Sequence, residues 1–294
     1  MANTNVSDFL LENRLRKLNP ELHQRFADTV VSIQKILFRF RKLFPEYTDH
    51  SGLHSMTVID FCNRLIGPEQ AERLNADSIY TLLMSCYLHD IGMAISEKQY
   101  EDALKEIPFG DYFQKNPDAE KERVVRDFHQ EFSAAFVRRY ARMLEIPSAE
   151  HEFAIIEVCR GHRRTDLFDV SQFPPHYTVP GGNEIPLPYL AALIRLADEI
   201  DVVAARNPIM LYDIESFTDA EEIAYHKQHE AVKELIIEED AFILHAVHTD
   251  EDIERMIAGT RDKMEKTLLY CREAARKQSS FRITQKEVRI LYLD

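Results

Sequence analysis

Apolar residues recur at intervals of three and four through most of the chain, which is the spacing of one buried helix face. This spacing predicts a helix over residues 20–44 and, after an interruption from Pro45 to Ser51, a second helix over 52–65. Residues 77–89 are apolar on nearly every side, so the helix that they predict should lie at the centre of a bundle. Further helices are expected over 120–144, 149–162, 190–206 and 250–277.

The pattern changes toward the C-terminus. Two short apolar runs at 235–237 and 242–244 predict a hairpin, and residues 281–293 alternate apolar and polar positions as a strand does. The last strand could pair with the hairpin in a three-stranded sheet or form a dimer contact. Residues 166–188 are rich in proline and glycine, which predicts no regular element.

The expected fold is therefore mainly α, a helical bundle with a small C-terminal β element. A chain of 294 residues can hold one enlarged core or two domains. We divide it into an N-terminal helical extension (1–45), a core (46–212) and a C-terminal helical and β-strand region packed on the core (213–294).

The net charge of −14 limits the classes of ligand. An acidic surface repels phosphate backbones, so long nucleic acid is not an expected partner, whereas a small anion can bind where cations reverse the local potential. No apolar run approaches the roughly 18 residues that span a bilayer, and the N-terminus lacks a signal-peptide pattern. We therefore expect a cytoplasmic protein without a membrane partner. The cysteines lie far apart in apolar surroundings, as reduced core thiols do; they are Cys62, Cys86, Cys159 and Cys271.

Histidines and aspartates spread over half the chain are the strongest chemical signal. Each lies at an expected helix end or on an expected buried face; they are His54, His89, Asp90, His129, His162 and Asp198. Imidazole with carboxylate suits a divalent transition metal, and helical bundles often build metal sites from one or two ligands per helix. Asp198 follows the apolar stretch 191–197, and a buried carboxylate requires a partner. Asp201 could pair with Arg195 or orient a ligand histidine.

Five fragments in a fixed order carry a family resemblance. They are Thr48-Asp-His-Ser-Gly-Leu-His-Ser-Met-Thr-Val58, Tyr87-Leu-His-Asp-Ile-Gly92, Phe128-His-Gln-Glu-Phe-Ser133, Cys159-Arg-Gly-His162 and Ile194-Arg-Leu-Ala-Asp-Glu-Ile-Asp201. Together they resemble the HD-domain superfamily of metal-dependent phosphohydrolases. The resemblance implies a first metal bound by His54, His89, Asp90 and Asp198, with Asp90 bridging to a second ion that His129 and His162 complete. The chain departs from some relatives at Gly92-Met93, where they place an assisting His or Lys.

The resemblance also implies a reaction. A phosphate ester or anhydride of a nucleotide-like small molecule would be hydrolysed by water activated at one or two divalent ions, which could be Mn, Fe, Co, Ni, Zn or Mg. Asp90 and His129 are the catalytic candidates. Two other classes remain open, because some relatives hold two irons and activate dioxygen, and a signalling or scaffold module could keep the fold without the chemistry. A homo-oligomer is possible.

Basic residues beside the predicted ligands are candidates for substrate binding. They are Arg160, Arg163 and Arg164 around His162, and Arg195 and Arg206 on either side of Asp198. We expect Arg163 and Arg206 to bind phosphate, since a guanidinium group can bind two oxygens at once, although surface ion pairs are an equal alternative. His50 lies four residues before His54 and could contact substrate or cap the helix.

Overall fold

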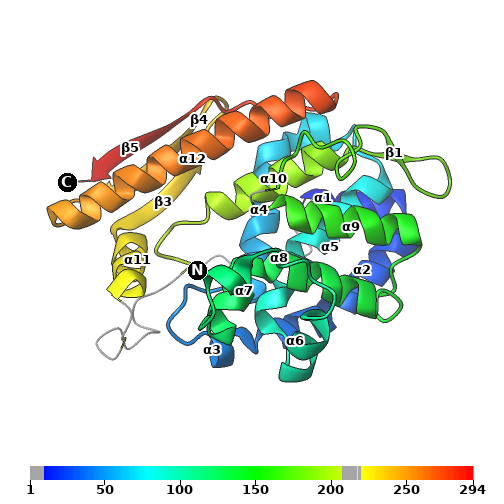
Figure 1. The fold of residues 1–294 in the computed structure, drawn as a ribbon. Helices are drawn as coiled ribbons and strands as arrows, with labels where there is room; N and C mark the ends of the chain where they lie inside the picture. Colours follow the sequence, from blue (N-terminus) through cyan, green and yellow to red (C-terminus); the bar gives the residue numbers. More distant parts are fainter. Residues whose placement is uncertain (1–9, 164, 207–216, 218–219, 294) are drawn as a thin grey trace.

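A computed structural model describes residues 10–163, 165–206, 217 and 220–293 of the protein. These residues form a helical body with a small sheet along one side (Figure 1). The mainly α fold with a C-terminal β element is therefore confirmed. The boundary expected between residues 212 and 213 lies outside the described residues.

The helical body is formed by residues 10–199. Its helices are α1 (Leu10–Leu18), α2 (Pro20–Leu37), α3 (Phe40–Leu43), α4 (Gly52–Ala71), α5 (Ala76–Leu88), α6 (Glu97–Ala103), α7 (Tyr112–Lys115), α8 (Lys121–Tyr140), α9 (Ala149–Gly161) and α10 (Leu187–Glu199), and the 3-10 turn η2 (Ile91–Ala94) follows α5. α5 is buried from Asp77 to Leu88 and packs against α1, α2, α4 and α9. This is the central position that its all-round apolar sequence predicts.

The helix expected over 20–44 is interrupted. α2 ends at Leu37, and the N–H of Arg39 donates to the carbonyl of Ile36 (2.9 Å), a tighter bond than the α-helical one. The tighter turn redirects the chain but still buries Phe40 and Phe44, whose rings stack at 5.4 Å. The apolar spacing therefore continues across a break in the helix.

Residues 166–188 contain a regular element, contrary to expectation. β1 (Tyr177–Thr178) pairs with β2 (Glu184–Ile185) in a short antiparallel hairpin. Gly181 and Gly182 supply the positive φ angles of its turn, 96° and 84°. All the prolines of this segment lie outside the paired residues, so none of them removes a bond of the hairpin.

α10 is displaced from the range 190–206 that its sequence suggests. It begins at Leu187 and accommodates Pro188 in its first turn, where a missing N–H breaks no helical bond. Beyond Ile200 the chain leaves the helix, and the N–H of Ala204 donates to the carbonyl of Val232 (2.8 Å) at the start of the sheet. This link to the C-terminal region ends the helix early.

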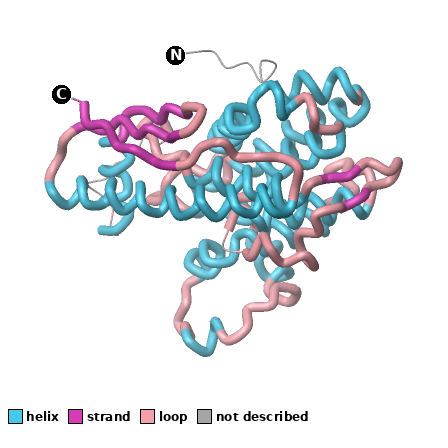
Figure 2. The backbone as a smooth tube through the Cα atoms, turned by 90° about the horizontal axis from the view of Figure 1, so that it is seen from above, coloured by secondary structure: helices cyan, strands magenta, loops and turns pink. Residues whose placement is uncertain are grey.

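The C-terminal region combines α11 (Ala220–Ala231), β3 (Val232–Ile237), β4 (Ala241–Val247), α12 (Glu251–Gln278) and β5 (Glu287–Leu293). The strand order is β3-β4-β5, with β3 antiparallel and β5 parallel to β4. Figure 2 shows this sheet running along α12, which also packs against α10. The three-stranded alternative for the terminal strand is thus confirmed.

One hydrophobic core joins the two regions, since its buried residues extend from Leu11 in α1 to Val288 in β5. All four cysteines are free and buried, as expected for core thiols. Among the described residues, no helix combines the length and the hydropathy that crossing a bilayer requires.

Candidate metal centre

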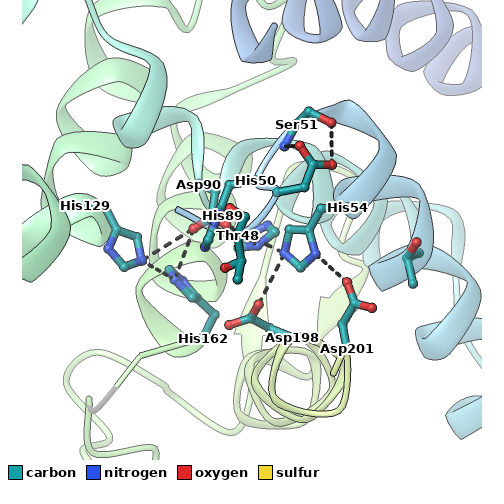
Figure 3. Close-up of polar contacts among 12 residues, drawn as sticks. Thr48, His50, Ser51, His54, His89, Asp90, His129, His162, Asp198 and Asp201 are labelled. Atoms are coloured by element: carbon teal, nitrogen blue, oxygen red, sulfur yellow. Dashed lines mark hydrogen bonds and ion pairs between the residues drawn. The ribbon is translucent and has the colours of Figure 1, made fainter. Parts of the chain in front are cut away.

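Five segments of the helical body bring the six predicted ligands together (Figure 3). His54 lies in the first turn of α4, His89 and Asp90 directly follow α5, His129 lies in α8, His162 directly follows α9, and Asp198 lies in the last turn of α10. Their donor atoms form two groups, each within 4.8 Å: one of His54, His89, Asp90 and Asp198, which we call the first group, and one of Asp90, His129 and His162, the second group.

Asp90 is common to both groups, and its two oxygens face different sets of histidines. Oδ2 lies 3.2 Å from Nε2 of His89 and 3.6 Å from Nε2 of His54. Oδ1 lies 3.4 Å from Nε2 of His129 and 3.6 Å from Nε2 of His162. A carboxylate in this position can bind two ions at once, one through each oxygen.

The Nδ1 atoms of the four histidines are committed to acceptors on the outer side of the centre. The Nδ1 of His54 binds Oδ2 of Asp201 (2.7 Å). Three others bind the backbone carbonyl three residues earlier; these pairs are His89 with Cys86 (3.0 Å), His129 with Arg126 (2.7 Å) and His162 with Cys159. An acceptor at Nδ1 requires the proton there, so in the neutral ring each Nε2 presents a lone pair to the centre.

No hydrogen-bond donor among the described residues of the protein is aligned with these inward-facing Nε2 lone pairs, whereas a cation could bind them. Nε2 of His129 lies 2.8 Å from Nε2 of His162, and neither nitrogen holds a proton when both Nδ1 atoms are donors. Nε2 of His54 lies 3.2 Å from Oδ1 of Asp198, and Nε2 of His89 lies 3.2 Å from Oδ2 of Asp90, but neither carboxylate is aligned for a hydrogen bond. Buried polar atoms are rarely left unpaired. The donor types, the tautomers and the orphaned nitrogens therefore all fit divalent metal.

The electrostatics of the ion-free centre favour a cation. Burial acts to raise the pKa values of Asp90 and Asp198, but neighbouring histidines outweigh it and hold both well below the usual range. Burial and the charge of Arg206 act to lower the pKa of His54, yet the carboxylates of Asp198 and Asp201 raise it to about 9. At neutral pH a second proton therefore occupies Nε2 of this ring, where a bound metal ion would replace it. Burial lowers the pKa values of His129 and His162. Both carboxylates are thus ionised and ready to meet positive charge.

Asp201 orients His54, which is one of the two roles open to it from sequence. It is fully buried, and Nη1 of Arg206 donates to its backbone carbonyl (2.8 Å). Nε of Arg206 lies 3.6 Å from Oδ2 of Asp201 as an ion pair and donates its hydrogen bond to the Asp49 carbonyl (3.1 Å). Arg195 does not pair with Asp201 but donates to the Gly161 carbonyl (2.6 Å). Arginines that flank the ligands in sequence therefore brace the helices around them.

Gly161 permits the close approach of α9 and α10. A Cβ at this position would overlap the Cβ of Ala191, with the Cα of Ala191 also only 3.1 Å away. Because Gly161 directly precedes His162, this contact brings His162 into the centre shared with Asp198. A glycine at a helix end is visible in the sequence, but its packing partner is not.

The predicted substrate residues differ in accessibility. Arg163 is exposed, whereas Arg206 is largely buried beside Asp201. The Nδ1 of His50 donates to the Thr48 carbonyl (2.6 Å), and burial lowers the pKa of this ring to about 3, so it is neutral. Arg160 binds Glu131 and Glu157, and Arg164 lies outside the described residues.

Access to the centre is from the side of α10. The side chain of Asp198 is 23% exposed, whereas that of His129 is 9% exposed and that of Asp90 only 4%. The remaining ligand side chains are fully buried. Among the six candidate ligands, Asp198 is therefore the one most open to solvent.

A comparison with known families supports the resemblance that the five fragments carry. The HD-CE family model matches residues 44–275, a range that includes all six residues of the centre and continues through most of α12. No curated protein and no solved structure matches the chain significantly. Since the match covers most of its length, the chain belongs to the HD-CE family and carries an HD-type domain.

Proposed function

We propose that this protein is a metal-dependent phosphohydrolase that acts on a phosphate ester or anhydride of a small, nucleotide-like molecule. The observation that carries the proposal is the position of Asp90, with one oxygen toward each group of histidine lone pairs. Such an arrangement suits a pair of divalent ions. When bound, these ions supply Lewis acidity and lower the pKa of a coordinated water from 15.7 to about 7.

The residues of the chain have separate tasks in this proposal. His54, His89 and Asp198 hold the first ion, His129 and His162 hold the second, and Asp90 serves both. The Arg126 carbonyl fixes the proton of His129 on Nδ1, so Nε2, which faces the centre, is the only nitrogen of this ring that can bind an ion. The partly exposed Asp198 leaves that side open to water and substrate.

The charge distribution favours a small substrate. The chain carries a net charge of −14, so a long polyanion is repelled, whereas one phosphate needs only a local cation. Arg163 follows His162 directly and is exposed, which makes it our candidate for the phosphate contact. The neutral His50 ring lies 5.6 Å from that of His54, and its Nε2 can accept a hydrogen bond from substrate. The existing contacts of Arg206 suit it better to bracing Asp201.

Metal analysis followed by an activity screen tests the function. The purified protein, a chelator-treated sample and samples reloaded with Mn, Fe, Co, Ni or Mg would be incubated with nucleotides and cyclic nucleotides. We expect phosphate or nucleoside products that vanish on metal removal and return on reloading. Turnover that requires dioxygen would indicate the di-iron oxygenase class instead. A protein that retains no divalent metal would contradict the proposal.

Arg163→Ala tests the phosphate contact. On the substrate identified, this variant should raise KM or lower kcat about tenfold at unchanged metal content, because charge-assisted hydrogen bonds to phosphate contribute about 1.5–3 kcal/mol. Arg276→Ala is the matched control, since that exposed arginine pairs with Glu273 near the end of α12. Equal kinetics for both variants and the parent would exclude Arg163.

A further inference from the structure

The hydroxyl of Ser133 makes hydrogen bonds to both ends of segment 89–92, which carries Asp90. It donates to the carbonyl of His89 (2.6 Å) and accepts from the N–H of Gly92 (2.9 Å). Ser133 is fully buried in α8, one helical turn after His129. One side chain thus joins the end of α5 to the helix that supplies a ligand of the second group.

The backbones at this junction are in direct contact. A Cβ at Gly92 would overlap the carbonyl oxygen of His129 and lie 2.8 Å from the nitrogen of Ser133. Directly before this contact α8 departs from helical geometry at Phe128 (φ −124°, ψ 16°). The ring of His129 bonds back to the Arg126 carbonyl beside this kink. The orientation of the His129 side chain therefore depends on how α8 packs against residues 89–92.

The two groups of ligands depend on this junction unequally. The first group takes its histidines from α4 and from the end of α5, and Asp198 comes from α10, so none of them lies on α8. The second group depends on the position of α8 relative to Asp90, because Oδ1 of Asp90 and Nε2 of His129 must bind the same ion. These two atoms lie 3.4 Å apart.

We propose that Ser133 is the positioning residue that determines whether the second group holds its own ion. The inference rests on the metal-dependent function proposed above and assigns Ser133 no contact with metal or substrate. Without the hydroxyl, the His89 carbonyl and the Gly92 N–H lose this partner in a fully buried position, and segment 89–92 is free to separate from α8. None of the four residues of the first group lies on α8, so a shift of α8 away from this segment leaves their positions relative to one another unchanged. The ring of His89 also stays fixed by the Cys86 carbonyl.

Metal binding by Ser133→Ala provides the test. Chelator-treated protein would be titrated with Mn²⁺ by calorimetry, and bound metal would be counted after gel filtration. We expect two ions in the parent; in the variant the first should bind unchanged and the second should bind about tenfold or more weakly, as for other residues that orient ligands. Thermal unfolding without metal would show whether both proteins remain folded.

Ser85→Ala is the matched control. Ser85 is also fully buried, and its hydroxyl donates to a backbone carbonyl, that of Ile155 (3.4 Å), rather than to segment 89–92. Its own carbonyl accepts the N–H of His89 (2.9 Å), a backbone bond that the substitution keeps. The control should bind both ions as the parent does. The inference is overturned if Ser133→Ala also binds both ions normally, or if the two variants lose affinity equally. One ion in the parent would refute the separate second ion and leave a metal-dependent function standing, whereas no ion would refute both.

Discussion

Two buried histidine–aspartate arrangements in this protein have opposite characters. At the N-terminal ends of α5 and α9, Nε2 of His151 binds Asp77 (2.8 Å) and Nδ1 meets the Ser148 hydroxyl (3.0 Å). The second oxygen of Asp77 accepts from the Asn183 side chain (2.7 Å). Every side-chain polar atom of this pair thus has a neutralising or hydrogen-bonding partner.

The metal centre has the same residue types and similar burial, but its pairing is incomplete. One nitrogen of each of the four histidine rings is fixed from outside. The other meets either a carboxylate that is not aligned for a hydrogen bond or another ring nitrogen. Burial and proximity of His to Asp therefore do not by themselves identify a metal ligand. We take a fixed Nδ1 with an unmatched Nε2 as the sign of a candidate metal ligand, and the predictions below test that distinction.

The largest effect should come from Asp90→Ala. Removing the carboxylate shared by both groups should abolish retention of both ions and reduce turnover by about three orders of magnitude, since a metal contributes several kcal/mol to the transition state. Elemental analysis and initial rates would measure this. Asp77→Ala is the matched control and should keep its full metal content. Equal metal in the Asp90 variant and the parent would contradict a bridging role.

Asp201→Asn should have the next largest effect. The amide keeps the size of the side chain but not its charge, so the Nδ1 proton of His54 is held less firmly and Nε2 becomes a weaker donor. Affinity for the first ion should fall about 10–100-fold. Competition with a metal-sensitive dye would measure it, with Asp77→Asn as the control. If both variants bind metal as the parent does, Asp201 does not tune the ligand.

Gly161→Ala should lower the free energy of unfolding by about 1–3 kcal/mol, because its methyl group must push α9 away from Ala191. Chemical denaturation would measure the loss, and metal binding should weaken because His162 moves with α9. Adding Ala191→Gly to this variant should restore part of the unfolding free energy and part of the metal affinity, as expected for two residues in direct contact. Additive losses in the double variant would place the strain elsewhere.

The smallest effect concerns the fully paired arrangement. The hydrogen bond from His151 lowers the pKa of Asp77 despite the opposing effect of burial. A depressed carboxylate pKa stabilises the fold above its unfolded value of about 3.9, and this stabilisation disappears as pH falls through the folded value. Asp77→Asn should therefore cost about 1.5 kcal/mol at pH 7 and progressively less below about pH 4. A difference in unfolding free energy that stayed constant with pH would argue against an ionised Asp77.

Much of the fold is predictable because its packing follows simple periodicity. The all-round apolar α5, the hairpin of β3 and β4, and the long α12 appear near their expected positions. The break after Leu37 is not predictable in this way, because apolar spacing continues across it. The β1–β2 hairpin is also hidden, since its prolines flank the pairing residues and its turn depends on two glycines.

The candidate metal centre likewise has parts that the sequence predicts and parts that it does not. The six ligands follow from residue type, order and resemblance, and their side chains do meet. The partners of Nδ1 in three of the histidines are backbone carbonyls, which carry no residue-specific signal. His89 and His162 directly follow a helix, and this position could have predicted that their Nδ1 atoms bond to a carbonyl of the last turn. The bracing roles of Arg195 and Arg206 depend on where α10 ends, which periodicity placed several residues too late.

His89, His129 and His162 bond back to the carbonyl three residues earlier, which makes each of these three candidate ligands part of the end of its own helix or of a kink. Helix ends are the first places where a folded protein opens. If the proposed metal centre is correct, ion binding should slow amide hydrogen exchange at the ends of α5 and α9 far more than in the middle of either helix. By reciprocity, a substitution that frays one of these ends should weaken ion binding, even where it touches none of the candidate ligands. Ordering of the helix termini and ion affinity are then one coupled equilibrium.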